Sequence, residues 1–129
     1  MKFSNQARVH GVSLAAYIVC DILLTPPAHL ETRPPARVTA IGDVVLGLLF
    51  VGLALAILAL VMLVRRSRRA PAVAMVAAVL FLPAFIAEQT RSFSALNPPA
   101  AIEAIEVVQV LVVVVVVVAA LWLFRSSEA

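Results

Sequence analysis

The segment "EAIEVVQVLVVVVVVVAALWLF", residues 103–124, decides the fold class of this chain. It contains a run of seven valines, and its only polar side chains before the final tryptophan are Glu103, Glu106 and Gln109. A helix needs about 20 mostly apolar residues, at about 1.5 Å per residue, to cross the roughly 30 Å hydrocarbon core of a bilayer. The segment therefore predicts a membrane-spanning helix.

A β-strand is the alternative for a run of valines, since β-branched residues favour strands in water. The apolar run is too long for a barrel strand, and it does not alternate apolar with polar residues as a membrane barrel requires. An isolated segment in lipid satisfies its own backbone hydrogen bonds only as a helix. We therefore interpret the valines as part of a helix that faces lipid or its neighbouring helices.

The composition of the whole chain points to the same class. Of the 129 residues, 64% are hydrophobic and 13% are charged, and the mean hydropathy is +1.09, which is far above that of a soluble domain. Four segments are long and apolar enough to span, at about residues 9–25, 39–64, 71–88 and 100–124. We expect an all-α, four-helix transmembrane bundle that forms a single domain over residues 1–129.

The first apolar segment has a second interpretation, because a basic start followed by a short apolar stretch is also typical of a cleaved signal peptide. Asp21 argues against this interpretation, since the apolar region of a signal peptide rarely contains an acid. Pro26 and Pro27 end the segment in either case. We expect the segment to be the first of four spans.

The basic residues predict the orientation of the bundle. With both termini in the cytoplasm, seven basic residues face inward and three face outward, as the positive-inside rule favours. The inward set is Lys2, Arg8, Arg65, Arg66, Arg68, Arg69 and Arg125, and the outward set is Arg33, Arg37 and Arg91. The "RRSRR" cluster at 65–69 is therefore interpreted as a topogenic signal that also contacts anionic lipid headgroups, and no nucleic-acid partner is expected.

Small residues at helical spacing predict the contacts between spans, because helices in lipid associate where their backbones approach closely. Gly52 and Ala56 repeat after four residues in the second span, and the third span repeats alanine at the same spacing at Ala70, Ala74 and Ala78. Pro83 has no N–H to donate one turn back, so a bend near Val79 is expected in the third span.

Polar side chains form a stripe on one face of the first span and on one face of the last. His10, Ser13, Tyr17 and Asp21 follow spacings of three, four and four residues, while Glu103, Glu106 and Gln109 are three residues apart. Lipid disfavours both stripes. We therefore expect the first and last spans to pack stripe against stripe, with Asp21 near Glu106 or Gln109.

Acidic residues gather toward the outer ends of the spans. Asp43 and Glu103 stand at helix starts, where a negative charge offsets the positive end of the helix dipole. Glu88 stands at a helix end and is expected to pair with Arg91 or Arg37. The candidate polar cluster is Tyr17, Asp21, Glu88, Arg91, Glu103, Glu106 and Gln109.

Asp21 and Glu106 are the most informative members of this cluster, because an ionisable group inside a membrane must be neutral, paired or hydrated. One interpretation is a structural tie between two helices. The other is a proton or cation site that opens to the external face. The sequence leaves both open and favours the structural tie.

No pattern for catalysis, a metal or a cofactor is present. Cys20 is the single cysteine, the two histidines stand far apart at His10 and His29, and no Gly-rich phosphate loop or nucleophile elbow occurs. We therefore expect no enzyme and no cofactor. The expected function is that of an accessory or structural subunit of a membrane complex, or of a self-associating bundle, in contact with lipids and other chains. The alternative is a proton- or cation-binding channel or carrier element. The excess of arginine, alanine and valine favours a bacterial plasma membrane.

Overall fold

The computed structural model describes residues 5–25, 28–30, 32–34, 37–94 and 96–128, with side chains up to Arg125. Lys2, Pro26 and Pro27, which entered the predictions above, lie outside these ranges. Within these ranges the chain forms five helices: α1 (Asn5–Leu24), α2 (Ala40–Val64), α3 (Ala70–Val79), α4 (Leu82–Gln89) and α5 (Ala100–Glu128). With α3 and α4 taken as one bent span, four helices are long and apolar enough to cross a membrane. The expected four-helix transmembrane bundle is confirmed.

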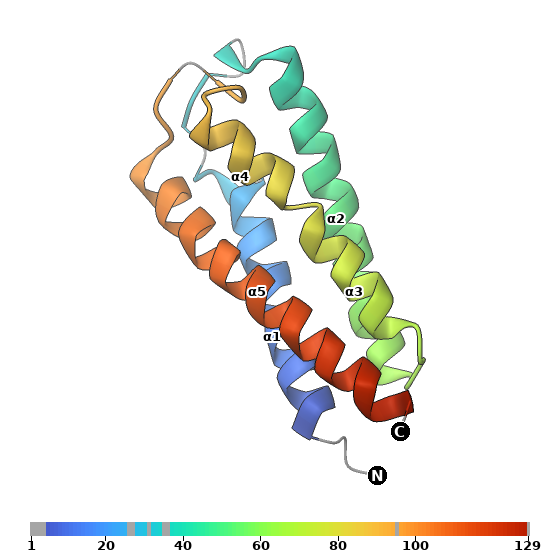
Figure 1. Cartoon of the computed structure of the whole chain (residues 1–129). Helices are drawn as coiled ribbons and strands as arrows, with labels where there is room; N and C mark the ends of the chain where they lie inside the picture. The colour runs from blue at the N-terminus through green and yellow to red at the C-terminus, as the bar shows by residue number, and fades with distance from the viewer. Residues whose placement is uncertain (1–4, 26–27, 31, 35–36, 95, 129) are drawn as a thin grey trace.

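The four spans run alternately up and down, so the connections collect at two ends (Figure 1). The start of α1, the 65–69 connection and the end of α5 lie at one end, which we call the arginine end. The connections from α1 to α2 and from α4 to α5 lie at the other, which we call the carboxyl end. Contacts run from α1 to α5 and α2, and from α3 to α2 and α5, so the spans form a closed ring.

Two helices extend beyond the expected apolar segments, α1 at its start and α5 at its end. α1 begins at Asn5 rather than near residue 9, and α5 continues to Glu128 rather than ending near 124. The flanking residues, 5–8 and 125–128, are mostly polar but include no proline or glycine, so the helix does not stop where the apolar run stops. The ends of these helices therefore extend beyond the apolar region.

The interface between α2 and α3 is built from small residues. Gly52 and Ala56 are buried on α2, and a Cβ added at Gly52 would lie 3.3 Å from the Leu80 Cβ and 3.4 Å from the Ala77 carbonyl oxygen. The alanines of α3 expected at the interface, Ala70, Ala74 and Ala78, are also buried. These small side chains let the two backbones approach, so the contact is made within the chain.

The third span is broken, as Pro83 predicts. α3 ends at Val79 and α4 begins at Leu82, with Pro83 in the first turn of α4. At the break the Phe81 N–H donates to the Ala78 carbonyl instead of to the Ala77 carbonyl one residue earlier. The break therefore leaves the Ala77 carbonyl oxygen available to another donor.

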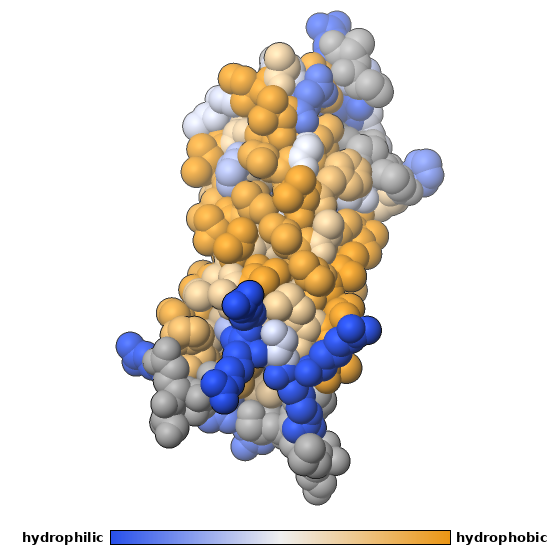
Figure 2. Space-filling model, turned by 90° about the vertical axis from the view of Figure 1, so that its right-hand side faces the viewer, coloured by the Kyte–Doolittle hydropathy of each residue, from blue (hydrophilic) through white to orange (hydrophobic). Residues whose placement is uncertain are grey.

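On the face that Figure 2 shows, an apolar belt lies between two polar ends. Exposed valines, leucines and isoleucines lie on every span, including Val12, Val44, Val76 and Leu111. Basic side chains gather below the belt, at the arginine end. This distribution is the one expected for a protein that spans a bilayer.

Candidate functional site

The polar stripes of α1 and α5 face each other inside the bundle. Asp21 and Gln109 are fully buried, Tyr17 and Glu106 nearly so, and α1 and α5 form the most extensive contact between two helices. The Gln109 side-chain amide donates to the Tyr17 carbonyl oxygen over 3.1 Å. The expected packing of the first span against the last is therefore confirmed.

Asp21 lies beside Gln109 on this interface. Neither carboxyl oxygen of Asp21 makes a hydrogen bond within the described part of the chain. An ionised carboxylate in such a position is costly, because the interior cannot replace its water. The neutral acid is therefore the form that this environment favours.

Tyr17 joins α1 to the break in the third span. Its hydroxyl donates to the Ala77 carbonyl oxygen over 2.7 Å, at the carbonyl that the Phe81 N–H does not reach. The hydroxyl thus satisfies a backbone acceptor released by the bend that Pro83 causes. This hydrogen bond links the first span to the third near the centre of the bundle.

His10 continues the stripe toward the arginine end and is fully buried. Its two ring nitrogens make no hydrogen bond to any described residue, while the Ser13 hydroxyl donates to the His10 carbonyl oxygen over 2.8 Å. His10 and Asp21 are thus two buried polar side chains at different depths of the same helix face.

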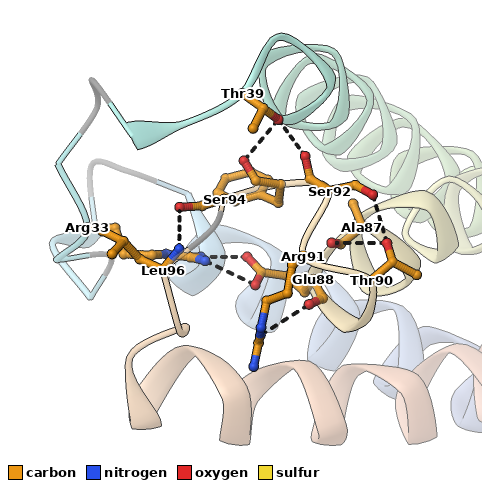
Figure 3. A network of polar contacts seen from close by, with 10 residues as sticks. Arg33, Thr39, Ala87, Glu88, Thr90, Arg91, Ser92, Ser94 and Leu96 are labelled. Atoms are coloured by element: carbon orange, nitrogen blue, oxygen red, sulfur yellow. Dashed lines mark hydrogen bonds and ion pairs between the residues drawn. The ribbon is translucent and has the colours of Figure 1, made fainter.

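Glu88 is paired with Arg33, not with Arg91 or Arg37. Two guanidinium nitrogens of Arg33 donate to the two carboxylate oxygens of Glu88, over 3.1 and 2.5 Å, and both side chains are buried (Figure 3). The Arg33 guanidinium also lies 4.9 Å from the centre of the Phe93 ring, within the range of a cation–π contact. Arg91 instead donates to the Glu88 backbone carbonyl over 3.3 Å.

The backbone conformation of Arg91 explains where its side chain lies. Its φ is 59°, and its N–H and that of Ser92 donate back to the carbonyls of Glu88 and Ala87. This is the Schellman end of a helix, in which the left-handed residue turns the chain away from the helix axis. The turn holds the side chain of Arg91 at the exposed surface, so the buried pair forms with Arg33 instead.

The α4–α5 connection is fastened to the start of α2. The Thr39 hydroxyl contacts the carbonyl oxygens of Ser92 and Phe93 (Figure 3). The same hydroxyl accepts a hydrogen bond from the Gly42 N–H. The Thr39 N–H donates to the Phe93 carbonyl oxygen. A Cβ on Gly42 would stand 2.6 Å from the Phe93 carbonyl oxygen, so only glycine fits there. These contacts hold Phe93 under the Arg33 guanidinium.

A cavity of about 250 Å³ lies at the carboxyl end, between the ends of α2, α4 and α5 and the two connections. Its lining includes three acidic residues, the exposed Asp43 and the buried Glu88 and Glu106, and one arginine, the buried Arg33. If all four are ionised, the lining carries a net charge of −2. Apolar side chains form the rest of the wall and include Leu24, Leu49 and Ile102. We call this space the carboxyl cavity.

The other members of the predicted polar cluster lie apart from this cavity. Glu103 is exposed in the first turn of α5, and Arg91 is exposed at the end of α4. Asp21, Tyr17 and Gln109 lie deeper, on the α1–α5 interface. The arginines expected to be topogenic, Arg65, Arg66, Arg68 and Arg69, are exposed at the opposite end of the molecule.

Sequence reasoning missed Arg33 and Phe93 as parts of the site. Both lie in connections without helical periodicity, and their meeting depends on the Thr39 contacts across more than 50 residues of sequence. The one available signal was the presence of three arginines, Arg33, Arg37 and Arg91, in the connections that lie at the carboxyl end. Within the described residues, no three His, Cys, Asp or Glu side chains are grouped so as to hold a metal ion.

Comparisons of the chain with protein-family models, with curated proteins and with solved structures find no match.

Proposed function

We propose that this is a non-enzymatic multi-pass membrane protein that binds a proton or a small monovalent cation in the carboxyl cavity, as part of a channel or carrier. The observation that carries the proposal is the balance of charged residues that line the cavity, three acidic residues against one arginine. The cavity lies at one end of a bundle of apolar helices, where the ion would enter from outside if both termini are cytoplasmic.

The physical argument concerns the net negative charge of the cavity lining. Arg33 pairs with Glu88 through two hydrogen bonds, and Glu106 is a further acidic residue of the lining, 4% exposed. Removing carboxylates from water costs several kcal/mol unless positive charge offsets it. A proton on Glu106, or a cation in the cavity, would lower the net negative charge of the lining, and it would exchange with the solution at the carboxyl end.

The accessory-subunit function has less structural support than the sequence suggested. The small residues expected to mediate association, Gly52 and Ala56 on α2 and the alanines of α3, are already used between α2 and α3. One observation keeps association as a second candidate: Gly47 and Ala54 are exposed on α2, seven residues apart on one helix face. A second chain, of this or another protein, would dock through this face.

Reconstitution into liposomes tests the ion proposal. We expect the protein to dissipate an imposed gradient of pH, Na⁺ or K⁺. The gradient that collapses identifies whether the ion that moves is a proton, Na⁺ or K⁺. Glu106→Gln should reduce the responding flux at least tenfold, because the neutral amide cannot exchange a proton or balance a cation. Glu103→Gln is the matched control, since it removes an exposed carboxyl one turn away on the same helix, and its flux should equal that of the parent. Equal loss in both variants, or no flux in the parent, contradicts the proposal.

Cross-linking tests the second candidate. Cysteines placed at Gly47 or Ala54, in a chain in which Cys20 is replaced by alanine, should form an intermolecular disulfide in the native membrane if α2 docks on another copy. A cysteine at Val12, on the exposed face of α1, is the control. A cross-link to a different protein supports the subunit function, and equal yields at all three positions contradict both forms of association.

A further inference from the structure

Two apolar grooves lie on the lipid-facing surface near the start of α1, far from the carboxyl cavity. The larger, of about 470 Å³, lies between α1 and α5, and its walls include Val9, Ala16, Leu111 and Val115. The smaller, of about 230 Å³, lies between α1 and α2, and its walls include Leu60 and Leu63. Both grooves therefore flank the same helix.

Arg8 and Val12 line both grooves. Val12 is 72% exposed and forms the ridge between them. Arg8 is exposed one turn earlier, at the arginine end, and forms no ion pair with any described carboxylate. The grooves thus share one accessible positive charge at the level where lipid headgroups lie.

The basic 65–69 connection adds to this charge. The smaller groove ends at Val64, and Arg65 follows directly in the chain. Among the described residues, Arg65, Arg68 and Arg69 also form no ion pair. An anionic group at the head of the grooves would therefore meet Arg8 on one side and the start of the arginine cluster on the other.

We infer that an anionic phospholipid binds here, with its phosphate at Arg8 and one acyl chain in each groove, so that the two chains straddle Val12. Acyl chains gain little by leaving bulk lipid for an apolar groove, because both environments are equally apolar. The preference of this site for one lipid over another therefore comes from the headgroup charge and from the shape of the paired grooves. The inference is independent of the proposed ion site, which lies at the opposite end of the bundle.

Native mass spectrometry of the protein released from nanodiscs provides the test, with equal amounts of phosphatidylglycerol and phosphatidylcholine as the probe. We expect one retained phospholipid per chain and an excess of phosphatidylglycerol of at least about fivefold, equivalent to about 1 kcal/mol for one basic side chain near the surface. Arg8→Gln should abolish the excess. Arg125→Gln is the matched control, since Arg125 is exposed near the same end but lines neither groove.

A second variant tests the grooves separately from the charge. Ala16→Phe places a large side chain in the α1–α5 groove and should reduce the retention of both lipids while leaving their ratio unchanged. The inference is overturned if Arg8→Gln and Arg125→Gln behave alike, if the parent shows no preference, or if Ala16→Phe retains lipid as well as the parent does.

Discussion

Arg33 shows most clearly how one side chain organises the carboxyl end. It belongs to the connection between α1 and α2, yet it is buried, binds both oxygens of Glu88 and lies over the Phe93 ring. Its guanidinium geometry suits this role, because two parallel N–H donors match the two oxygens of a carboxylate. The sequence indicated that Glu88 needs an arginine, but the expected partners were Arg91 or Arg37, and Arg33 was not among them.

Replacing Arg33 should therefore cost far more than replacing a neighbouring arginine. Arg33→Gln leaves Glu88 buried without its cation, and breaking a buried ion pair in this way typically costs about 3–5 kcal/mol. Arg91→Gln is the control, because the Arg91 side chain is exposed and makes one long bond to a backbone carbonyl, so the expected change is within about 0.5 kcal/mol. The free energy of unfolding in mixed detergent micelles measures both. Similar values for the two variants would show that Glu88 does not depend on Arg33.

At the scale of elements, the spans and the break were predictable because their causes are local in sequence. Apolar length predicted the four spans, and Pro83 alone predicted where α3 ends. The attachment of the 92–94 segment to the start of α2 was not predictable, since it rests on single contacts such as that of Thr39 with Phe93. Nor could spacing reveal that the Tyr17 hydroxyl binds the carbonyl that the break releases.

The two glycines near the start of α2 provide a test at this scale. Gly42→Ala should destabilise the protein by about 1–3 kcal/mol, because the new methyl group would meet the Phe93 carbonyl oxygen at 2.6 Å and push the 92–94 segment away. Gly47→Ala, five residues later, should stabilise the protein by about 0.5–1 kcal/mol, because nothing lies within 4 Å of the added carbon and alanine favours the helix. The midpoint of thermal unfolding should thus move in opposite directions. A shift of the same sign in both variants would contradict the close packing at Gly42.

At the scale of the whole molecule, charge is divided between the ends of the bundle. The arginine end carries the 65–69 cluster, while the carboxyl end carries the cavity and its acids. The positive-inside rule then predicts that the arginine end faces the cytoplasm. The overall arrangement of the bundle follows from composition. The cavity also depends on side chains from both connections, and the sequence did not predict where these side chains lie.

Single cysteines test this orientation in intact cells. With Cys20 replaced by alanine, a membrane-impermeant maleimide should label Asn97→Cys, at the carboxyl end, without permeabilisation. It should label Ser67→Cys, in the arginine cluster, only after the membrane is opened. The reverse pattern would place the carboxyl cavity on the cytoplasmic side and would remove the proposed route of ion entry from outside.

The most direct measurement of cation or proton binding is an infrared difference spectrum of the reconstituted protein, recorded on exchanging Na⁺ or K⁺ for a large organic cation and on changing pH. The proposed function predicts a change in a carboxyl band in the parent and in Glu103→Gln, and its loss in Glu106→Gln. A spectrum that does not respond, or a response that survives in Glu106→Gln, would contradict ion binding at the carboxyl cavity.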